Sequence, residues 1–121
     1  LHWMVHSFPT RRSSDLPMIR NAFKMQLKPG AVDEYKKRHA EIWPELAKAH
    51  SDAGIFDYSI YFDEETLTLF AFQKLNDDHT ADGLKDLGIV QKWWNYMADL
   101  MEVHPDNSPV FTPLREVFHM D

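Results

Sequence analysis

The stretch "IFDYSIYFDEETLTLFAFQK", residues 55–74, decides the fold because it holds two strand-like runs separated by a short polar turn. Residues 55–63 and 66–74 are rich in aromatic and β-branched side chains, and Glu64 and Glu65 supply the turn between them. Two such runs joined by a short polar turn are typical of a β-hairpin. We therefore expect a sheet in which these two strands pair antiparallel.

Side chains alternate between the two faces of a strand, and both faces of this hairpin are apolar. In the first strand we expect one face to carry Phe56, Tyr58, Ile60 and Phe62, and the other to carry Ile55 and Tyr61. In the second strand, Phe70 and Phe72 are expected opposite Leu67, Leu69 and Ala71. A sheet covered by helices on one face and wet on the other normally shows polar residues on the wet face. We therefore predict a homodimer, a dimeric α+β barrel in which the sheets of two copies face each other around a pocket.

The rest of the chain places one strand and one helical region on each side of the hairpin. Residues 18–27 alternate like a strand, and residues 31–52 show helical spacing, with a kink or restart expected at Pro44 and a stop at Gly54. An irregular helix is expected near 77–87, a second long helix over 88–103, a turn at 104–109 and a last strand over 112–120. The order β-α-β-β-α-β predicts an α+β fold of the ferredoxin-like type, with both helices on one face of an antiparallel sheet.

Residues 1–17, "LHWMVHSFPTRRSSDLP", show no periodicity and do not have the order of a signal peptide. The segment "TRRSSDL" is also the in-frame translation of a common sequencing adaptor. We interpret residues 1–17 as a non-native or disordered leader, with Met18 as the true start and residues 18–121 as a single domain. A natural disordered tail is the alternative, which re-sequencing of the locus would separate from adaptor read-through.

Composition excludes several classes of function. The chain has 121 residues, a formal charge of −6 and no cysteine. Nucleic acid and anionic membranes are poor partners for an acidic chain, and no apolar run approaches the roughly 20 residues of a membrane span. Without cysteine, disulfides and thiol nucleophiles are excluded. We expect a cytoplasmic protein that contacts neither nucleic acid nor membrane.

The candidate for chemistry is His39, four residues after Tyr35 and four before Trp43, which would place all three on one helix face. Histidine is the side chain best suited to exchange protons near neutral pH. A single histidine in an apolar stripe is also a common structural residue of a core. At this level both interpretations of His39 remain open.

Three further side chains are candidates for binding. Trp93 and Trp94 are adjacent on a helix and diverge by about 100°, so we expect one of them to lie near a cavity, although packing alone would also explain the pair. Tyr58 carries a hydroxyl on an apolar face, which requires a partner, either a substrate oxygen or a backbone carbonyl. His50, His104 and His119 are scattered without metal-ligand spacing and are interpreted as structural. The chain has no phosphate-binding loop, dinucleotide fingerprint or nucleophile elbow, so we expect a reaction without cofactor, metal or covalent intermediate.

These residues occur in segments that resemble the L-rhamnose mutarotase family. The segments are "MIRNAFKMQL" (18–27), "EYKKRHAEIWPEL" (34–46), "YSIYFD" (58–63), "QKWWNYMADLM" (91–101) and "PDNSPVFTPLREVF" (105–118). The combination of R-H-x-x-I-W-P-E-L, W-W-x-Y-M and P-D-N-S-P is far more specific than any one of them. Residues 76–87 match the family least well, so their contribution to sugar preference is left open.

The resemblance implies a small cytoplasmic homodimer that interconverts the α and β anomers of L-rhamnose without a cofactor, in rhamnose catabolism. It implies that His39 is the proton donor, and that Tyr35, Tyr58, Trp93 and Trp94 contact the sugar. The chemistry suits these residues, because ring opening and closure need only proton transfers at two oxygens. The alternatives are a mutarotase for another 6-deoxy sugar, a different dimeric ferredoxin-like enzyme such as a cofactor-free monooxygenase, and a sugar-binding sensor.

Overall fold

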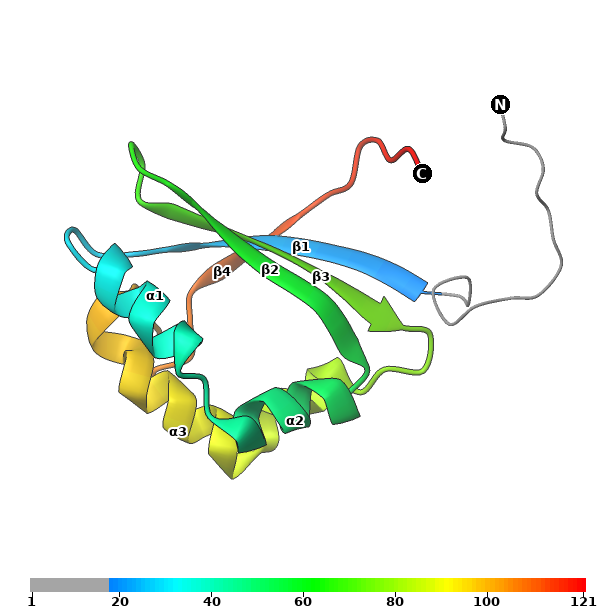
Figure 1. Ribbon diagram of the computed structural model, residues 1–121, viewed down its shortest axis with the longest axis horizontal. Helices are drawn as coiled ribbons and strands as arrows, with labels where there is room; N and C mark the ends of the chain where they lie inside the picture. The colour runs from blue at the N-terminus through cyan, green and yellow to red at the C-terminus, as the bar shows by residue number, and fades with distance from the viewer. Residues whose placement is uncertain (1–17) are drawn as a thin grey trace, which may run out of the picture.

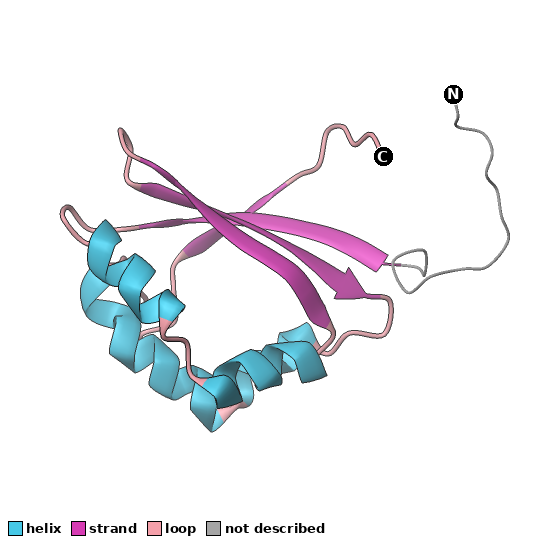
Figure 2. Ribbon diagram, in the orientation of Figure 1, coloured by secondary structure: helices cyan, strands magenta, loops and turns pink. Residues whose placement is uncertain are grey.

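The strands of residues 18–121, the part of the chain that the computed structural model describes, form one antiparallel sheet (Figures 1 and 2). The strands are β1 (Met18–Gln26), β2 (Ile55–Asp63), β3 (Thr68–Asn76) and β4 (Phe111–Leu114). They lie in the order β2-β3-β1-β4, and each neighbouring pair is antiparallel. The predicted α+β fold with a ferredoxin-like order is therefore confirmed. The expectation about residues 1–17 falls outside the described residues.

The helices cover one face of the sheet (Figure 1). They are α1 (Val32–Ala40), α2 (Pro44–Asp52), the 3₁₀ turn η2 (Ala81–Asp86), α3 (Gly88–Met97) and the 3₁₀ turn η3 (Ala98–Leu100). The irregular helix expected near 77–87 corresponds to η2. The second long helix is shorter than the predicted 88–103, because Met101 leaves it to form a bridge with Leu27.

Pro44 divides the first helical region into two helices, as its missing backbone donor predicts. Trp43 has an extended conformation, with ψ of 129°, which is the conformation that a residue before proline favours. Pro44 then occupies the first turn of α2, where its fixed φ suits the start of a helix. After α2, Gly54 adopts a φ of +88°, which ends the helix where the sequence predicts it.

A β-bulge in β2 changes the faces that simple alternation predicts. The register with β3 shifts between Phe56 and Ser59, and the extra residue, Asp57, has a positive φ of 48°. Ile55 is consequently buried opposite Leu75, whereas Tyr61 is 64% exposed. The expectation that Ile55 and Tyr61 share a face was wrong, because one inserted residue reverses the phase of the strand. The bulge puts Ile55 on the same face as Tyr58, Ile60 and Phe62.

Two other element boundaries differ from the predictions. The turn of the hairpin spans residues 64–67 rather than the two glutamates, since Leu67 has a φ of 60° and its N–H donates to the Asp63 carbonyl at 2.8 Å. The last strand ends at Leu114 instead of continuing to residue 120. It is an edge strand that contains Pro113, which cannot donate to a ladder. Val117, Phe118 and Met120 follow it and are 84%, 76% and 78% exposed.

The main hydrophobic core lies between the sheet and the helices α1 and α3. Its buried members are Met25, Leu27, Ala31, Tyr35, Leu69, Ala71, Met97, Leu100 and Met101. This core holds the ends of α1 and α3 against β1 and β3, which leaves α2 and β2 to line the space beside it. None of the helices in residues 18–121 is long and apolar enough to cross a membrane.

Candidate active site

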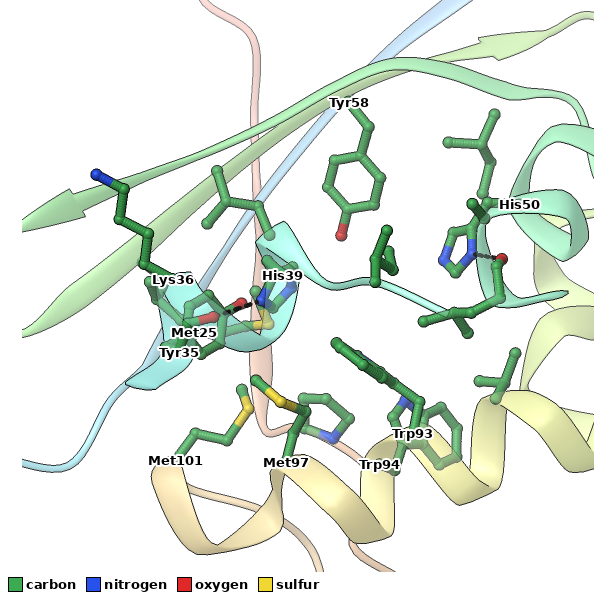
Figure 3. A pocket seen from close by; sticks show the side chains of 18 of the residues that line it. Met25, Tyr35, Lys36, His39, His50, Tyr58, Trp93, Trp94, Met97 and Met101 are labelled. Atoms are coloured by element: carbon green, nitrogen blue, oxygen red, sulfur yellow. Dashed lines mark hydrogen bonds between the residues drawn. The ribbon is translucent and has the colours of Figure 1, made fainter. Parts of the chain in front are cut away.

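A cavity of about 700 Å³ lies between the helices and the sheet of one chain (Figure 3). Its volume falls in the range of roughly 300–1,000 Å³ that is usual for small-molecule sites. The predicted pocket between two facing sheets is therefore not the one that the structure contains. The reason is that Tyr58, Ile60 and Phe62 face the helices, with Ile60 and Phe62 opposite buried residues of β3.

His39 and Tyr35 lie one turn apart on α1, and both line this cavity. The His39 Nδ1 is 3.0 Å from the Tyr35 backbone oxygen, and the two rings are 4.3 Å apart between centroids. Because a carbonyl can only accept, this bond assigns the hydrogen of a neutral imidazole to Nδ1. The Nε2 lone pair then points away from the helix backbone toward the cavity. Desolvation lowers the pKa of His39, and the opposing effect of the Tyr35 carbonyl is smaller.

The two tyrosines of the site are held as neutral hydroxyl groups. Burial raises the pKa of Tyr58 to about 12, and it raises that of Tyr35 well above its usual range, with a smaller contribution from Tyr58. Tyr58 is 40% exposed and lines the cavity. Its hydroxyl points into the cavity in Figure 3, and within residues 18–121 no backbone carbonyl accepts from it. Tyr58 is thus available as a hydrogen-bond donor to a ligand.

Trp93 and Trp94 both line the cavity, although alternation around the helix predicted only one of them near it. The rings of His39 and Trp93 pack edge to face, with centroids 5.3 Å apart and an interplanar angle of 87°. Trp43 packs against Trp93 at 5.1 Å. Trp43 does not share a helix face with His39 as expected, because α1 ends at Ala40. It reaches the same aromatic cluster from the link between α1 and α2.

Arg38 fixes the position of α1 relative to α3. Its guanidinium donates to the Tyr96 backbone oxygen at 2.6 Å and to the Asp99 Oδ1 at 2.9 Å, and it pairs with Glu34 at 2.7 Å. Asp99 and Glu34 raise the pKa of Arg38 further, so the guanidinium is permanently charged. These bonds hold the neighbouring His39 against Trp93, and they make the arginine a support of the site rather than part of the cavity wall.

The structure adds His50 to the site, which the sequence treatment interpreted as structural. His50 lies on α2, lines the cavity and has its ring centroid 6.1 Å from that of Tyr58. His50 follows His39 by eleven residues, about three turns of an unbroken helix, but the break between α1 and α2 means that this spacing could not place it beside His39. His104 and His119 do not line the cavity, and His119 instead contacts Asp121 at 2.9 Å.

Among residues 18–121 no group of three or more histidine, aspartate or glutamate side chains is arranged to hold a metal ion. That the reaction needs neither metal nor cofactor remains a prediction from the sequence. The cavity offers the imidazoles of two histidines, the neutral phenols of two tyrosines, two indoles, an ammonium group and a hydroxyl. These belong to His39, His50, Tyr35, Tyr58, Trp93, Trp94, Lys36 and Ser51. Such a set can hold a neutral polyol and move a proton on it.

Comparisons with known proteins place the chain among sugar isomerases. A family model described as L-rhamnose mutarotase matches residues 20–120. Proteins named L-rhamnose mutarotase from Phocaeicola vulgatus and Bacteroides thetaiotaomicron are each 62% identical over 104 residues, which cover 86% of this chain and 100% of each relative. The crystal structure of an L-rhamnose mutarotase from Formosa agariphila is 53% identical, superposes with a TM-score of 0.78, and covers 85% of this chain and 99% of its own.

Proposed function

This chain belongs to the L-rhamnose mutarotase family, and from that premise we propose that it interconverts the α and β anomers of L-rhamnose. The observation that carries the proposal is the His39 Nε2, which faces a cavity of about 700 Å³ with its tautomer fixed by the Tyr35 carbonyl. Identity of up to 62% to proteins named for this activity supports it. The protein is an isomerase that feeds rhamnose catabolism.

His39 performs the proton transfers of ring opening. Its neutral Nε2 accepts the proton of the anomeric hydroxyl, the C1–O1 bond becomes a carbonyl and the bond from C1 to the ring oxygen breaks. The imidazolium formed in this step then donates its proton to the ring oxygen, so that His39 is the proton donor to the leaving group. Both oxygens are attached to C1, so one imidazole can serve both. Rotation about C1–C2 and the reverse steps give the other anomer.

The remaining residues bind the sugar. Tyr35 and Tyr58 donate hydrogen bonds from hydroxyls whose raised pKa values keep them protonated. Trp93 and Trp94 supply aromatic surface for the C–H faces of the pyranose. None of these roles requires a metal or cofactor, because the reaction transfers only protons and leaves the oxidation state of the sugar unchanged.

The outer face of the sheet supports a homodimer. Tyr61 and Phe72 are 64% and 45% exposed and pack edge to face at 5.8 Å, beside the half-buried Phe70. An apolar patch of this kind on a sheet usually marks a protein interface. We infer that a second copy of the chain covers it in the cytoplasm, where the sugar is the only other partner.

The activity is tested by saturation-transfer NMR on the anomeric protons of L-rhamnose. We expect magnetisation to exchange between the anomers well above the rate in buffer, in proportion to the enzyme concentration. Acceleration for another 6-deoxy sugar but not for L-rhamnose would correct the substrate. Binding of L-rhamnose without acceleration would contradict the proposal and favour a sugar sensor.

A further inference from the structure

His50 repeats on α2 the arrangement that His39 has on α1. Its Nδ1 is 2.9 Å from the Leu46 backbone oxygen, four residues earlier, just as the His39 Nδ1 is 3.0 Å from the Tyr35 oxygen. The carbonyl again assigns the hydrogen to Nδ1. The other ring nitrogen of His50 therefore lies on the cavity side, as Figure 3 shows. The site thus contains two imidazoles in the same tautomer, on two different helices.

Within residues 18–121, this nitrogen of His50 makes no hydrogen bond to the protein. The cavity wall includes the buried apolar residues Leu46, Ile55 and Val90, and Ser51 is the polar neighbour of His50 in the sequence that also lines it. In the part of the chain that the structure describes, the His50 imidazole makes one hydrogen bond, from its Nδ1 to the Leu46 backbone oxygen. A half-buried polar nitrogen costs free energy unless something bonds to it. A ligand hydroxyl in the cavity is the group that can.

Tyr58 completes the recognition of such a hydroxyl. The ring centroids of His50 and Tyr58 are 6.1 Å apart, and both side chains point into the same space (Figure 3). The His50 Nε2 is an acceptor, and the neutral Tyr58 hydroxyl is a donor. A sugar hydroxyl is both donor and acceptor, so it can donate to the His50 Nε2 and accept from the Tyr58 hydroxyl at the same time. A methyl or methylene group at that point would leave both protein groups unpaired.

We propose that His50 is a sugar-binding residue that accepts a hydrogen bond from the hydroxyl on C3 or C4 of the pyranose, and thereby determines which sugars the site accepts. The assignment rests on the proposed function, in which His39 acts at C1. C3 and C4 form the edge of the ring opposite C1 and the ring oxygen, which is the edge directed at α2 when C1 is at α1. His50 therefore binds without taking part in either proton transfer.

The test uses His50→Leu and His50→Gln, with His104→Leu as the matched control. Leucine removes the polar nitrogen while keeping an apolar side chain and good helix propensity, and glutamine restores a hydrogen-bonding group. His104 is exposed and does not line the cavity. The thermal midpoint of each variant is measured first. Anomer exchange is then measured by NMR over a range of concentrations of L-rhamnose and of its 2-deoxy, 3-deoxy and 4-deoxy derivatives.

We expect His50→Leu to raise KM for L-rhamnose by roughly three- to tenfold, the effect of one neutral hydrogen bond, with little change in kcat. His50→Gln should recover part of this loss, and His104→Leu should show none. The 2-deoxy sugar should keep the full effect. For either the 3-deoxy or the 4-deoxy sugar, wild type and His50→Leu should have the same KM, because the hydroxyl that His50 contacts is missing.

Two outcomes overturn the assignment. One is a His50→Leu effect that is absent, or equal for all four sugars. The other is a loss of kcat at unchanged KM, which would place His50 in the chemistry instead of in binding. Wild-type enzyme that fails to accelerate L-rhamnose would refute the proposed function itself. An active wild type combined with either of the first two outcomes refutes the role of His50 alone.

Discussion

The two faces of the sheet both carry aromatic residues, yet they differ in what surrounds those residues. On the helix side, Tyr58 joins His39 and His50 around the cavity. On the outer side, Tyr61 and Phe72 pack together, and Ser59 lies opposite Phe72. The same face also carries basic residues of β1 and β3, Arg20, Lys24 and Lys74. Aromatic content alone therefore does not identify a ligand site. A concave surface with convergent polar atoms does identify a ligand site. Such a surface forms here because α2 and the other helices enclose a cavity against the sheet.

The largest expected effect separates the two faces by their chemistry. His39→Gln keeps a polar side chain of similar reach but cannot transfer protons, so kcat should fall by roughly 10²–10⁴-fold. KM should change little, and circular dichroism should stay that of the wild type. Saturation transfer between the anomeric protons of L-rhamnose measures the rate. A variant that retains half of the wild-type kcat would show that another group performs the proton transfers.

The pH dependence supplies a second readout of the same histidine. The folded pKa of His39 is lowered below its ordinary 6.5 by desolvation. The active form is the neutral one, so kcat/KM should be level above pH 6.5 and should fall as the pH decreases through a value below 6.5. Protonation is also less favourable in the folded than in the unfolded state, so His39 lowers the free energy of unfolding over the same interval. An acid limb centred above 6.5 would contradict this sign.

The next effect concerns the outer face. Phe72→Glu places a charge in the exposed aromatic patch, and it should raise the dissociation constant of the dimer by about 30-fold or more, as for a central interface residue. Multi-angle light scattering at micromolar concentration measures the mass. Lys92→Glu, on the exposed side of α3, is the control and should leave the dimer intact. A wild-type protein that is already monomeric under these conditions would overturn the assembly.

The smallest effect compares the same chemical change on both faces of β2. Tyr58→Phe removes the hydroxyl that points into the cavity, and we expect KM for L-rhamnose to rise by roughly three- to tenfold. Tyr61→Phe removes a hydroxyl from the outer face, and its KM should stay within about twofold of the wild type, since that hydroxyl lies on the face of the sheet away from the cavity. Equal effects of the two variants would mean that the faces do not differ in the way the cavity indicates.

Much of the fold could be predicted from local patterns. The alternation in residues 18–27 and 55–74 and the helical spacing around Pro44 were sufficient for the element order and for the break between α1 and α2. The ends of the outer elements were not predictable in the same way. The alternation of residues 115–120 looks like a strand, but β4 ends at Leu114, since pairing depends on a neighbour and not on the pattern alone.

The candidate site was predictable in its residue types but not in its location. Tyr35, His39, Tyr58, Trp93 and Trp94 all line one cavity. Their roles in binding and catalysis remain predictions. Periodicity predicted a pocket between two sheets, because both faces of the hairpin are apolar. No short sequence pattern specifies how far the helices lie from the sheet, so the cavity between them could not be predicted. His50 was missed because the break at residues 41–43 interrupts the stripe that would have linked it to His39.

The bulge at Asp57 determines which kind of mutation this site tolerates least. Downstream of the bulge, Ile60 and Phe62 face the helices on the same side as Ile55 because the strand contains one extra residue, Asp57. Loss of the Asp57 codon would leave Ile55, Tyr58 and Ile60 in simple alternation on the helix side, whereas loss of a codon downstream of the bulge, such as that of Ser59, would turn the residues after it to the opposite face. Sequences that retain the activity should therefore align without gaps through residues 59–63, and a one-residue gap in this strand should fall at the bulge.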